Sequence, residues 1–391
     1  MILRILFFLA LLLFLPIWGI DRMSLRRRWR KYWRWALYLP NVVLFAALCY
    51  VAASESYTVE ATYWKGLLLT WTLCIAIPEA LVALLMLPGL FFRRRPRVRC
   101  FIHGFAYSVG AVGLAIMLYG FTLGYRQLVV KDFNYVSARL PKAFDGYRVV
   151  QFSDLHLGTF NGDTTVVRSI VDQINALDAD LVVFTGDLVN TAGKELAPYT
   201  HLLGKIRARD GVMAVMGNHD YSHYYRWTTA ADSLQDVEQF KQGVRSMGWR
   251  LLLNENAIVR RGTDSIAVLG VENDGRPPFP ALGDLDKAQA GLADHCFRLL
   301  LSHDPSHWLR RVVPETHIDL TLSGHTHGMQ FRVGNFSPAA WFYPQWGGAY
   351  RQDDGRTLYV SLGVGEALLP FRFGAWPEVN RIVLRTADGN E

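Results

Sequence analysis

Four long apolar runs fill the first third of this 391-residue chain and constrain its fold more than any other feature. A helix needs about 20 apolar residues to cross the hydrocarbon core of a bilayer, which is about 30 Å thick. The last three runs are long enough, whereas the first is short and contains Pro16. The runs are about Ile5–Ile20, Ala36–Ala53, Gly66–Leu90 and Phe101–Gly124. We therefore expect an N-terminal all-α transmembrane domain of four helices over residues 1–125.

The first run has a second interpretation, as a cleaved signal peptide. Its positive charges follow the apolar residues instead of preceding them, and no small-x-small cleavage site appears before Arg26. Both observations favour a membrane span.

Basic residues are concentrated beside the apolar runs. Residues 1–127 carry 15 Lys/Arg and 4 Asp/Glu, whereas residues 128–391 carry 26 and 30. A nucleic-acid-binding protein would spread its basic residues over a polar folded face, so no nucleic-acid partner is expected. The chain has four cysteines, three of them in the apolar third, which excludes a disulfide framework.

The distribution of basic residues among the loops predicts the orientation in the membrane. Asp21–Trp35 holds seven Lys/Arg and Arg93–Arg99 holds five, while Ser54–Lys65 holds one. By the positive-inside rule the two basic loops are cytoplasmic. With four spans, both termini and everything after Gly124 then lie outside the cytoplasm.

Glu79 follows Pro78 inside the third apolar run. An intramembrane carboxyl group is a candidate functional group. The alternative is a carboxyl group that is hydrogen-bonded at a proline kink and faces another helix. A transporter-like role would rest on Glu79 alone, and the sequence has no second half with a matching interrupted helix.

From Gln127 onward, short runs rich in Val, Ile, Leu, Phe and Tyr alternate with turns, which predicts strands. Helical periods such as Thr164–Leu177 and Ser233–Met247 lie between them. This alternation indicates an α/β domain over residues 126–391, with strands covered on both faces. The expected strands are Leu128–Val130, Tyr147–Phe152, Leu181–Thr185, Val212–Met216, Ile266–Val271, Phe297–Ser302, Asp319–Ser323, Thr357–Leu362 and Asn380–Leu384.

Polar clusters follow directly on five of these strands. They are Ser153–Gly158, Thr185–Asp187, Gly217–Asp220, Ser302–Asp304 and Ser323–Gly328. Ligands bind at the carboxyl ends of the strands in an open α/β sheet, so we expect the five clusters to converge on one site.

The converging side chains are suited to metal ions. Carboxylate, imidazole and amide groups fit Mn, Fe, Zn or Co, and the absence of thiolate argues against a structural zinc site. Seven ligands are too many for one ion, so we expect two ions that share a carboxylate. Asp154 and His156 are spaced i, i+2, as are His325 and His327, and extended backbone would point both side chains of each pair to the same side. The seven are Asp154, His156, Asp187, Asn218, His303, His325 and His327.

Charge predicts the chemistry of such a centre. Two divalent ions together with Asp154 and Asp187 leave a positive surplus, which attracts an anionic phosphoester and lowers the pKa of a bridging water. We expect in-line attack of a metal-bound hydroxide on phosphorus.

Five sequence blocks resemble the calcineurin-like metallophosphoesterase superfamily, in the expected order and over about residues 146–375. The blocks are Asp154-x-His156, Gly186-Asp187, Gly217-Asn218-His219-Asp220, His303 and Gly324-His325-x-His327. The first and last are similar to the bacterial membrane-associated branch that includes YkuE- and YaeI-like phosphodiesterases. The resemblance implies a four-layer α/β/β/α sandwich in the soluble part. Together with the four spans and the orientation predicted above, this bacterial branch implies a multi-pass protein of the inner membrane with its catalytic domain on the periplasmic side.

The resemblance also implies a role for each site residue. One metal ion would be bound by Asp154, His156 and His327, and the other by Asn218, His303 and His325, with Asp187 bridging. His219 would act on the phosphoryl group or the leaving oxygen without being a ligand. Manganese is the favoured metal, with iron, zinc and cobalt as alternatives.

The sequence departs from the family pattern at two positions. Asn190 stands where the protein-phosphatase branch has an Asp that orients the histidine, so a carboxylate–His dyad and protein substrates are not expected. Met329 replaces a glycine usual in the closest branch, which would reshape one wall of the mouth.

Aromatic residues after the last ligands are expected to rim the site. They lie in Trp341–Trp346 and Leu368–Trp376. These rings either fill a second core or form an apolar lip that dips into the bilayer and admits a lipid-borne phosphate, with Arg372 near the head group. His223, among tyrosines and a tryptophan past Asp220, is a second candidate substrate contact.

The sequence thus predicts a membrane-anchored phosphoesterase with two metal ions. Its expected substrate is a phosphomonoester, phosphodiester or pyrophosphate of a lipid or envelope component. The alternative is a membrane receptor or structural subunit that binds a phosphorylated ligand at the metal site without turnover.

Overall fold

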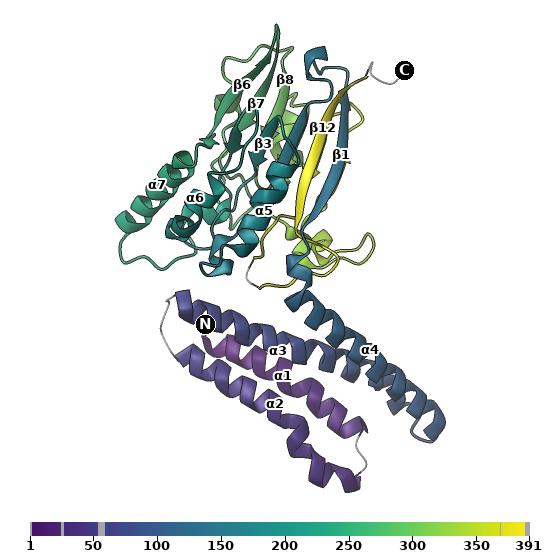
Figure 1. Cartoon of the computed structure of the whole chain (residues 1–391). Helices are drawn as coiled ribbons and strands as arrows, with labels where there is room; N and C mark the ends of the chain where they lie inside the picture. Colours follow the sequence, from purple (N-terminus) through teal and green to yellow (C-terminus); the bar gives the residue numbers. More distant parts are fainter. Residues whose placement is uncertain (1, 25–26, 54–58, 368, 388–391) are drawn as a thin grey trace. The chain divides into compact units, whose positions relative to one another are not determined.

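The computed structural model describes residues 2–24, 27–53, 59–367 and 369–387. The chain divides into two compact units, Met1–Leu123 and Gly124–Glu391. Long helices make up the first unit, and the strands belong to the second (Figure 1).

The first unit contains the four helices expected from the apolar runs. They are α1 (Ile2–Ser24), α2 (Arg27–Ala53), α3 (Val59–Met86) and α4 (Pro96–Thr122). Each includes a segment long and apolar enough to cross a membrane. Proline and glycine set the boundary between the last two helices, because Pro88 and Gly89 form a short 3-10 turn and Pro96 opens α4.

Asn41 of α2 joins three helices through its side-chain amide. Its Nδ2 donates hydrogen bonds to the Leu13 carbonyl oxygen of α1 at 2.7 Å and to Oε2 of Glu79 in α3 at 2.8 Å. Glu79 therefore has a hydrogen-bond partner on another helix, beside Pro78, as the second interpretation of this carboxyl group requires. Of the basic residues expected in the first loop, Arg26 lies outside the described residues and the others belong to α1 and α2.

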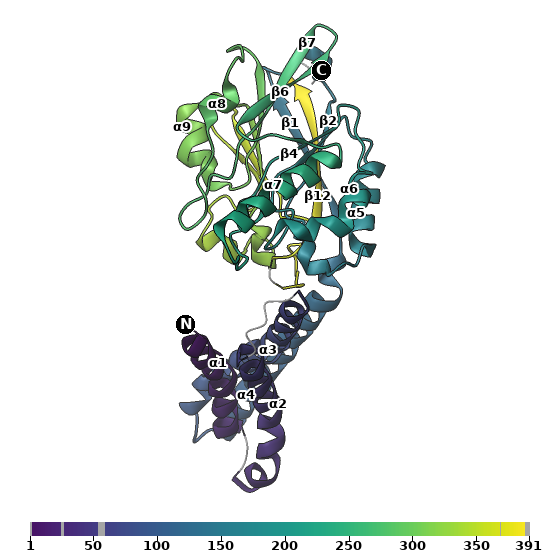
Figure 2. The same ribbon diagram turned by 90° about the vertical axis from the view of Figure 1, so that its left-hand side faces the viewer.

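Two six-stranded sheets form the framework of the second unit (Figures 1 and 2). Sheet A has the order β1-β12-β2-β3-β4-β5, and sheet B has the order β10-β11-β9-β8-β7-β6. The strands are β1 (Val129–Ser137), β2 (Arg148–Phe152), β3 (Leu181–Phe184), β4 (Val212–Ala214), β5 (Arg250–Leu251), β6 (Glu255–Arg261), β7 (Asp264–Gly270), β8 (Phe297–Leu301), β9 (Leu320–Ser323), β10 (Gly348–Arg351), β11 (Thr357–Val360) and β12 (Glu378–Thr386).

The two sheets pack face to face around a buried apolar core. Val149 and Leu181 contribute to this core from sheet A, and Val268 and Leu299 contribute from sheet B. Apolar residues next to these in the strands point to the opposite faces, because side chains alternate along a strand. Both faces of the central strands are therefore buried, as their continuous apolar runs predicted.

Helices cover the outer faces of the two sheets. The helices α5 (Thr165–Ala176), α6 (Thr200–Leu203) and α7 (Ala230–Ser246) pack on sheet A. The shorter α8 (Leu285–Gln289) and α9 (Val313–Glu315) pack on sheet B. In α5, the spacing of Val167, Ile170, Val171 and Ile174 puts all four on one buried stripe.

The edges of the sheets differ most from the predicted strands. The short β5 and the edge strands β6 and β10 were not expected, and β1 continues to Ser137, well past the predicted end at Val130. Lys131 and Asp132 are exposed on β1, so its sequence lacks a continuous apolar run. Edge strands have one open side and tolerate such polar residues.

The direction of β1 determines where the second unit begins. β1 is parallel to β12, and β12 is antiparallel to β2. Val129 pairs with Glu378, and Asn380 pairs with Gln151 near the end of β2. The chain therefore enters sheet A at the end of the sheet where β2 finishes, which is also where β1 and β12 begin.

Candidate metal centre

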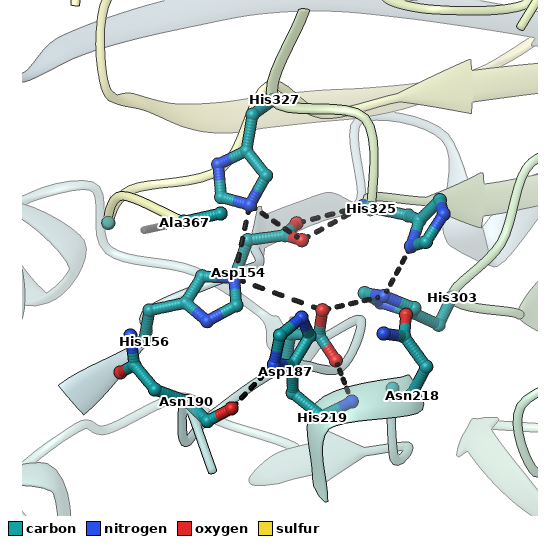
Figure 3. Close-up of polar contacts among 12 residues, drawn as sticks. Asp154, His156, Asp187, Asn190, Asn218, His219, His303, His325, His327 and Ala367 are labelled. Carbon is teal, nitrogen blue, oxygen red and sulfur yellow. Dashed lines mark hydrogen bonds and ion pairs between the residues drawn. The ribbon is translucent and has the colours of Figure 1, made fainter. Parts of the chain in front are cut away.

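The seven expected ligands lie in the turns that follow β2, β3, β4, β8 and β9, and the structure brings all seven together (Figure 3). Three of these strands belong to sheet A and two to sheet B. Two facing sheets therefore build the site, whereas the order of the clusters suggested one sheet.

Five of the seven ligands have left-handed backbone, with φ between 49° and 74°: Asp154, His156, Asp187, His325 and His327. Non-glycine residues adopt this conformation only where surrounding contacts hold it. Here the Asp154 N–H donates to the Gly186 carbonyl at 2.9 Å, and the Leu155 N–H donates to the Asp187 carbonyl at 2.9 Å. The i, i+2 pairs thus converge through tight turns, and the extended backbone predicted for them is wrong.

One group of ligands comprises Asp154, His156 and His327. Nε2 of His156 lies 3.1 Å from Nε2 of His327, and the latter lies 3.4 Å from Oδ1 of Asp154. The ligand atoms of this group all lie within 4.8 Å of one another. This spacing fits a single ion between them.

A second group comprises Asp187, His303 and His325, with the same limit of 4.8 Å between ligand atoms. Nε2 of His303 lies 3.1 Å from Oδ2 of Asp187 and 3.2 Å from Nδ1 of His325. The same Oδ2 lies 3.8 Å from Nε2 of His156 in the first group. Asp187 is therefore placed between the two groups.

The donor set fits metal ions in two further respects. Oδ1 of Asn218 is buried and has no hydrogen-bond partner among the described residues. In each group two imidazole nitrogens face each other at hydrogen-bond distance. If neither of the two facing nitrogens carries a proton, two lone pairs point at each other and no hydrogen bond forms between the rings. A shared cation would satisfy all of these lone pairs.

Hydrogen bonds from outside the centre orient three of the ligands. The Thr185 carbonyl lies 2.8 Å from Nδ1 of His303, which leaves Nε2 of that ring facing Asp187. The Tyr343 hydroxyl lies 2.7 Å from Nε2 of His325, and the Tyr224 hydroxyl accepts from Nδ2 of Asn218 at 3.0 Å. Such partners fix ring tautomers and the amide orientation.

Burial and charge set the protonation of the ligands. Burial lowers the pKa of His156 to about 3 and that of His325 to about 4. Burial also opposes the charged form of His303, but the Asp187 carboxylate outweighs it and raises the pKa of His303 to about 10. Burial disfavours ionised Asp187 as well, yet His303 and His219 hold the pKa of Asp187 well below its ordinary value. Without a cation, protonated His303 carries the positive charge beside Asp187, and binding of a metal ion there would displace that proton.

His219 lies beside the two groups. Its main-chain N–H donates to Oδ1 of Asp187 at 2.9 Å, and its Nδ1 donates to the Asn190 carbonyl oxygen at 2.6 Å. Its ring stacks on Tyr224 with centroids 4.3 Å apart. The side chain of Asn190 bonds elsewhere, to the main chain and hydroxyl of Thr159.

Sequence reasoning missed three residues that support the centre. Tyr224 and Tyr343 were visible only as members of aromatic clusters. The third, Asp220, was visible in the third block but was given no role. Its buried carboxylate accepts hydrogen bonds from the main-chain N–H groups of Asp187, Leu188, Val189 and Gly217.

The centre opens into a cavity of about 290 Å³. His156, Asp187, Asn218, His219, His325 and His327 form its floor, and Thr326 also lines it. The walls are Phe279, Met329, Phe342, Tyr343 and Ala367, with no Lys or Arg among the described residues that line it. Met329 does form part of the mouth, as its departure from the family pattern suggested.

Arg372 is fully buried, and its expected contact with a head group is wrong. Its guanidinium donates to the carbonyl oxygens of Gly365, Leu362 and Ala375 and contacts Nδ1 of His327. The group therefore supports the chain behind His327 instead of facing substrate. His223 is exposed and lies outside the lining of the cavity, so its contact with substrate stays a prediction.

The aromatic residues expected at the rim divide between surface and interior. Trp341 and Phe342 are exposed, whereas Trp346, Phe371, Phe373 and Trp376 are partly buried. Leu368 lies outside the described residues.

Comparison with known proteins gives consistent matches. The family profile described as calcineurin-like phosphoesterase matches residues 147–329. A Danio rerio protein named transmembrane protein with metallophosphoesterase domain is 32% identical over 282 residues, which are 70% of this chain and 61% of that protein. A Bos taurus protein of the same name is 30% identical over 254 residues, or 64% of this chain and 55% of that protein. The chain thus spans less than two thirds of these two relatives.

A bacterial relative is matched over most of its length. The uncharacterized metallophosphoesterase YkuE of Bacillus subtilis (strain 168) is 30% identical over 265 residues, which are 64% of this chain and 84% of that protein. The four apolar helices and the names of the two vertebrate relatives indicate a membrane protein.

Proposed function

Because the chain belongs to the calcineurin-like metallophosphoesterase family and is a metal-dependent phosphoester hydrolase, we propose that it works with two divalent ions held by the seven ligands. The bond hydrolysed is a phosphoester or pyrophosphate bond of a lipid or cell-envelope component. The four helices anchor the enzyme in a bacterial inner membrane, and the catalytic domain lies on the periplasmic side.

The position of Asp187 is the observation that carries this proposal. Its Oδ2 lies 3.1 Å from a ligand nitrogen of one group and 3.8 Å from a ligand nitrogen of the other. Asp154, His156 and His327 would hold one ion, and Asn218, His303 and His325 the other. Manganese fits this donor set, as do iron, zinc and cobalt.

When bound, two such ions lower the pKa of coordinated water and neutralise charge on a phosphoryl group. The residues of the chain do the rest. The Asn190 carbonyl holds the proton of His219 on Nδ1, so Nε2 is the nitrogen through which His219 acts on a phosphoryl oxygen or a leaving oxygen in the cavity. Phe279, Met329 and Phe342 place apolar surface beside an ester bound at the centre.

Turnover of generic esters by the purified full chain tests this function. Bis(p-nitrophenyl) phosphate, p-nitrophenyl phosphate and inorganic pyrophosphate are each supplied with Mn²⁺, Zn²⁺, Co²⁺ or Fe²⁺. We expect hydrolysis of at least one of them, and loss of that hydrolysis after chelation. Metal binding without any turnover would instead identify a receptor or structural subunit.

Reporter fusions test the orientation. A fusion at Val130 should report an extracytoplasmic position, and a fusion at Arg95 should report a cytoplasmic one. The reverse pattern would place the catalytic domain in the cytoplasm.

A further inference from the structure

Exposed apolar side chains gather in one segment of the catalytic unit. Ten large apolar side chains are exposed among its described residues, and five of them fall between residues 329 and 342. These five form what we call the lip: Met329, Val333, Phe336, Trp341 and Phe342. Their exposed fractions range from 48% to 72%, a concentration that marks an interaction surface on a soluble domain.

The lip is continuous with the cavity above the metal centre. Met329 and Phe342 are both exposed on the surface and part of the cavity wall. The apolar surface therefore leads from the outside of the domain down to the ligands. Among the described residues that line the cavity there is no Lys or Arg of the kind that binds the several charges of a soluble polyphosphate compound.

The backbone of the lip is held in place. The Arg332 N–H donates to the Phe373 carbonyl at 2.7 Å, and the Phe373 N–H donates to the Gln330 carbonyl at 3.0 Å. The ring centroids of Phe336 and Trp341 lie 5.9 Å apart. Ser337, between them, donates to the Gly328 carbonyl at 2.6 Å. The exposed rings are thus presented by an ordered backbone.

The chain that leads to the apolar helices enters the catalytic unit beside this segment. Only five residues, Gly124–Leu128, separate the first unit from β1. Gly124 packs against the Arg372 carbonyl oxygen, with no room for a Cβ between them. The next residue along, Phe373, is the one that pairs with the lip segment at Gln330 and Arg332. Within the catalytic unit, the entering segment Gly124–Leu128 and the lip therefore lie at the same end of sheet A, where β2 stops.

We propose that the lip inserts into the interfacial layer of the bilayer and that the substrate is a phosphate ester of a lipid in that bilayer. Apolar side chains on an amphipathic surface bind in this interfacial layer, and the ring of Trp341, which is apolar with one polar N–H group, is suited to that layer. The lipid's hydrocarbon part stays in the bilayer while its phosphate passes along Met329 and Phe342 to the centre. This substrate class rests on the function proposed above.

The reaction at this site is a hydrolysis. A water oxygen bonds to phosphorus, the bond from phosphorus to the leaving alcohol oxygen breaks, and the proton released by water ends on that alcohol. No oxidant, reductant or further reactant is needed.

Photo-crosslinking of the full chain tests the insertion of the lip. The photoreactive residue p-benzoylphenylalanine replaces Phe336 or Trp341, and in a matched control it replaces Leu234, which is also exposed but lies on α7. Each protein is placed in nanodiscs of phosphatidylcholine and phosphatidylglycerol and irradiated, and phospholipid adducts are measured by mass spectrometry. We expect at least about tenfold more lipid adduct at Phe336 and Trp341 than at Leu234. Equal labelling at the three positions, or adducts to protein alone, would overturn the proposal.

A turnover experiment separates this proposal from the proposed function. Phe336→Ser with Trp341→Ser should hydrolyse bis(p-nitrophenyl) phosphate within about twofold of the parent, since neither side chain lines the cavity. Hydrolysis of phosphatidylglycerol in the nanodiscs, or of phosphatidic acid in nanodiscs where it replaces phosphatidylglycerol, should fall at least about tenfold. Equal losses on the soluble and lipid esters would overturn the role of the lip in turnover. A parent protein that cross-links to lipid but hydrolyses no ester would support insertion of the lip into the bilayer and refute the proposed function.

Discussion

The main-chain carbonyl oxygen of Asn190 lies 2.6 Å from Nδ1 of His219. A carbonyl accepts a hydrogen bond without carrying charge, so this contact holds His219 in one tautomer without a carboxylate beside the ring. The contact that orients His219 therefore comes from the backbone and does not depend on an aspartate side chain at position 190. Asn190 uses its side chain to hold Thr159 instead.

Substitutions at these two positions should have unequal effects. His219→Ala should lower kcat/KM by about 10²- to 10⁴-fold, the range for loss of a general acid or base, while bound metal stays unchanged. Asn190→Ala keeps the carbonyl and should lower kcat/KM by less than about tenfold. The measurement is hydrolysis of a soluble phosphodiester at saturating Mn²⁺, with metal content by mass spectrometry. Equal losses in the two variants would show that the Asn190 side chain orients the ring.

Asp187→Asn should reduce metal content. The substitution keeps the shape of the side chain but removes the negative charge shared by the two groups. We expect the variant to retain one equivalent of metal or fewer and to lose at least about 10²-fold in kcat. Asp178→Asn is the matched control, because Asp178 is an exposed aspartate that also has positive φ. Two equivalents of metal in the Asp187 variant would refute a shared carboxylate.

The two tyrosine hydroxyls should contribute to metal affinity. Tyr343→Phe and Tyr224→Phe remove the partners of His325 and Asn218. Each should weaken the binding of Mn²⁺ by about 10- to 100-fold, as measured by titration calorimetry of the full chain in detergent. Tyr199→Phe is the control, since it removes a hydroxyl bonded to the Gly162 main chain. Unchanged affinity in both site variants would show that the ligands hold their orientation unaided.

Glu366 should make stability depend on pH. Its carboxyl group is buried, neither oxygen has a partner among the described residues, and burial raises its pKa from 4.5 to about 8. The unfolded chain releases this proton near its ordinary pKa, whereas the folded chain keeps it until the pKa of about 8. The contribution of the Glu366 carboxyl group to stability is therefore complete below about pH 4.5 and is lost as the pH rises from there to about 8.

Glu366→Gln removes that dependence. The thermal midpoint of the variant should match that of the parent at about pH 5 and exceed it at about pH 9. Differential scanning fluorimetry of both full chains in detergent measures the difference. A difference between the two chains that does not change with pH would assign the effect to packing instead of to ionisation.

The convergence of the seven side chains could be predicted from sequence because local features identify them. Asp154, Asp187 and His325 each come directly after an apolar strand, β2, β3 and β9, and the ends of these strands meet although they belong to two facing sheets. The left-handed turns at the same residues could not be predicted. Their φ values depend on contacts such as the one between Asp154 N–H and the Gly186 carbonyl, which join separate parts of the chain.

Arg372 shows a second limit of sequence reasoning. An arginine among aromatic residues suggested a surface position beside a head group. Its guanidinium is instead satisfied by carbonyl groups of Leu362, Gly365 and Ala375, and no sequence pattern announces such an arrangement of acceptors. The edge strands posed a related difficulty, because β6 and β10 lack the continuous apolar runs of the central strands.

The entry of the chain into sheet A at the end where β2 stops has a kinetic consequence under the proposed mode of substrate delivery. Enzyme and substrate lipid would meet by lateral diffusion in two dimensions, so the mole fraction of substrate lipid among all lipids of the membrane would govern the rate. Diluting the vesicles in buffer would leave turnover per enzyme unchanged, whereas diluting the substrate with inert lipid would slow it.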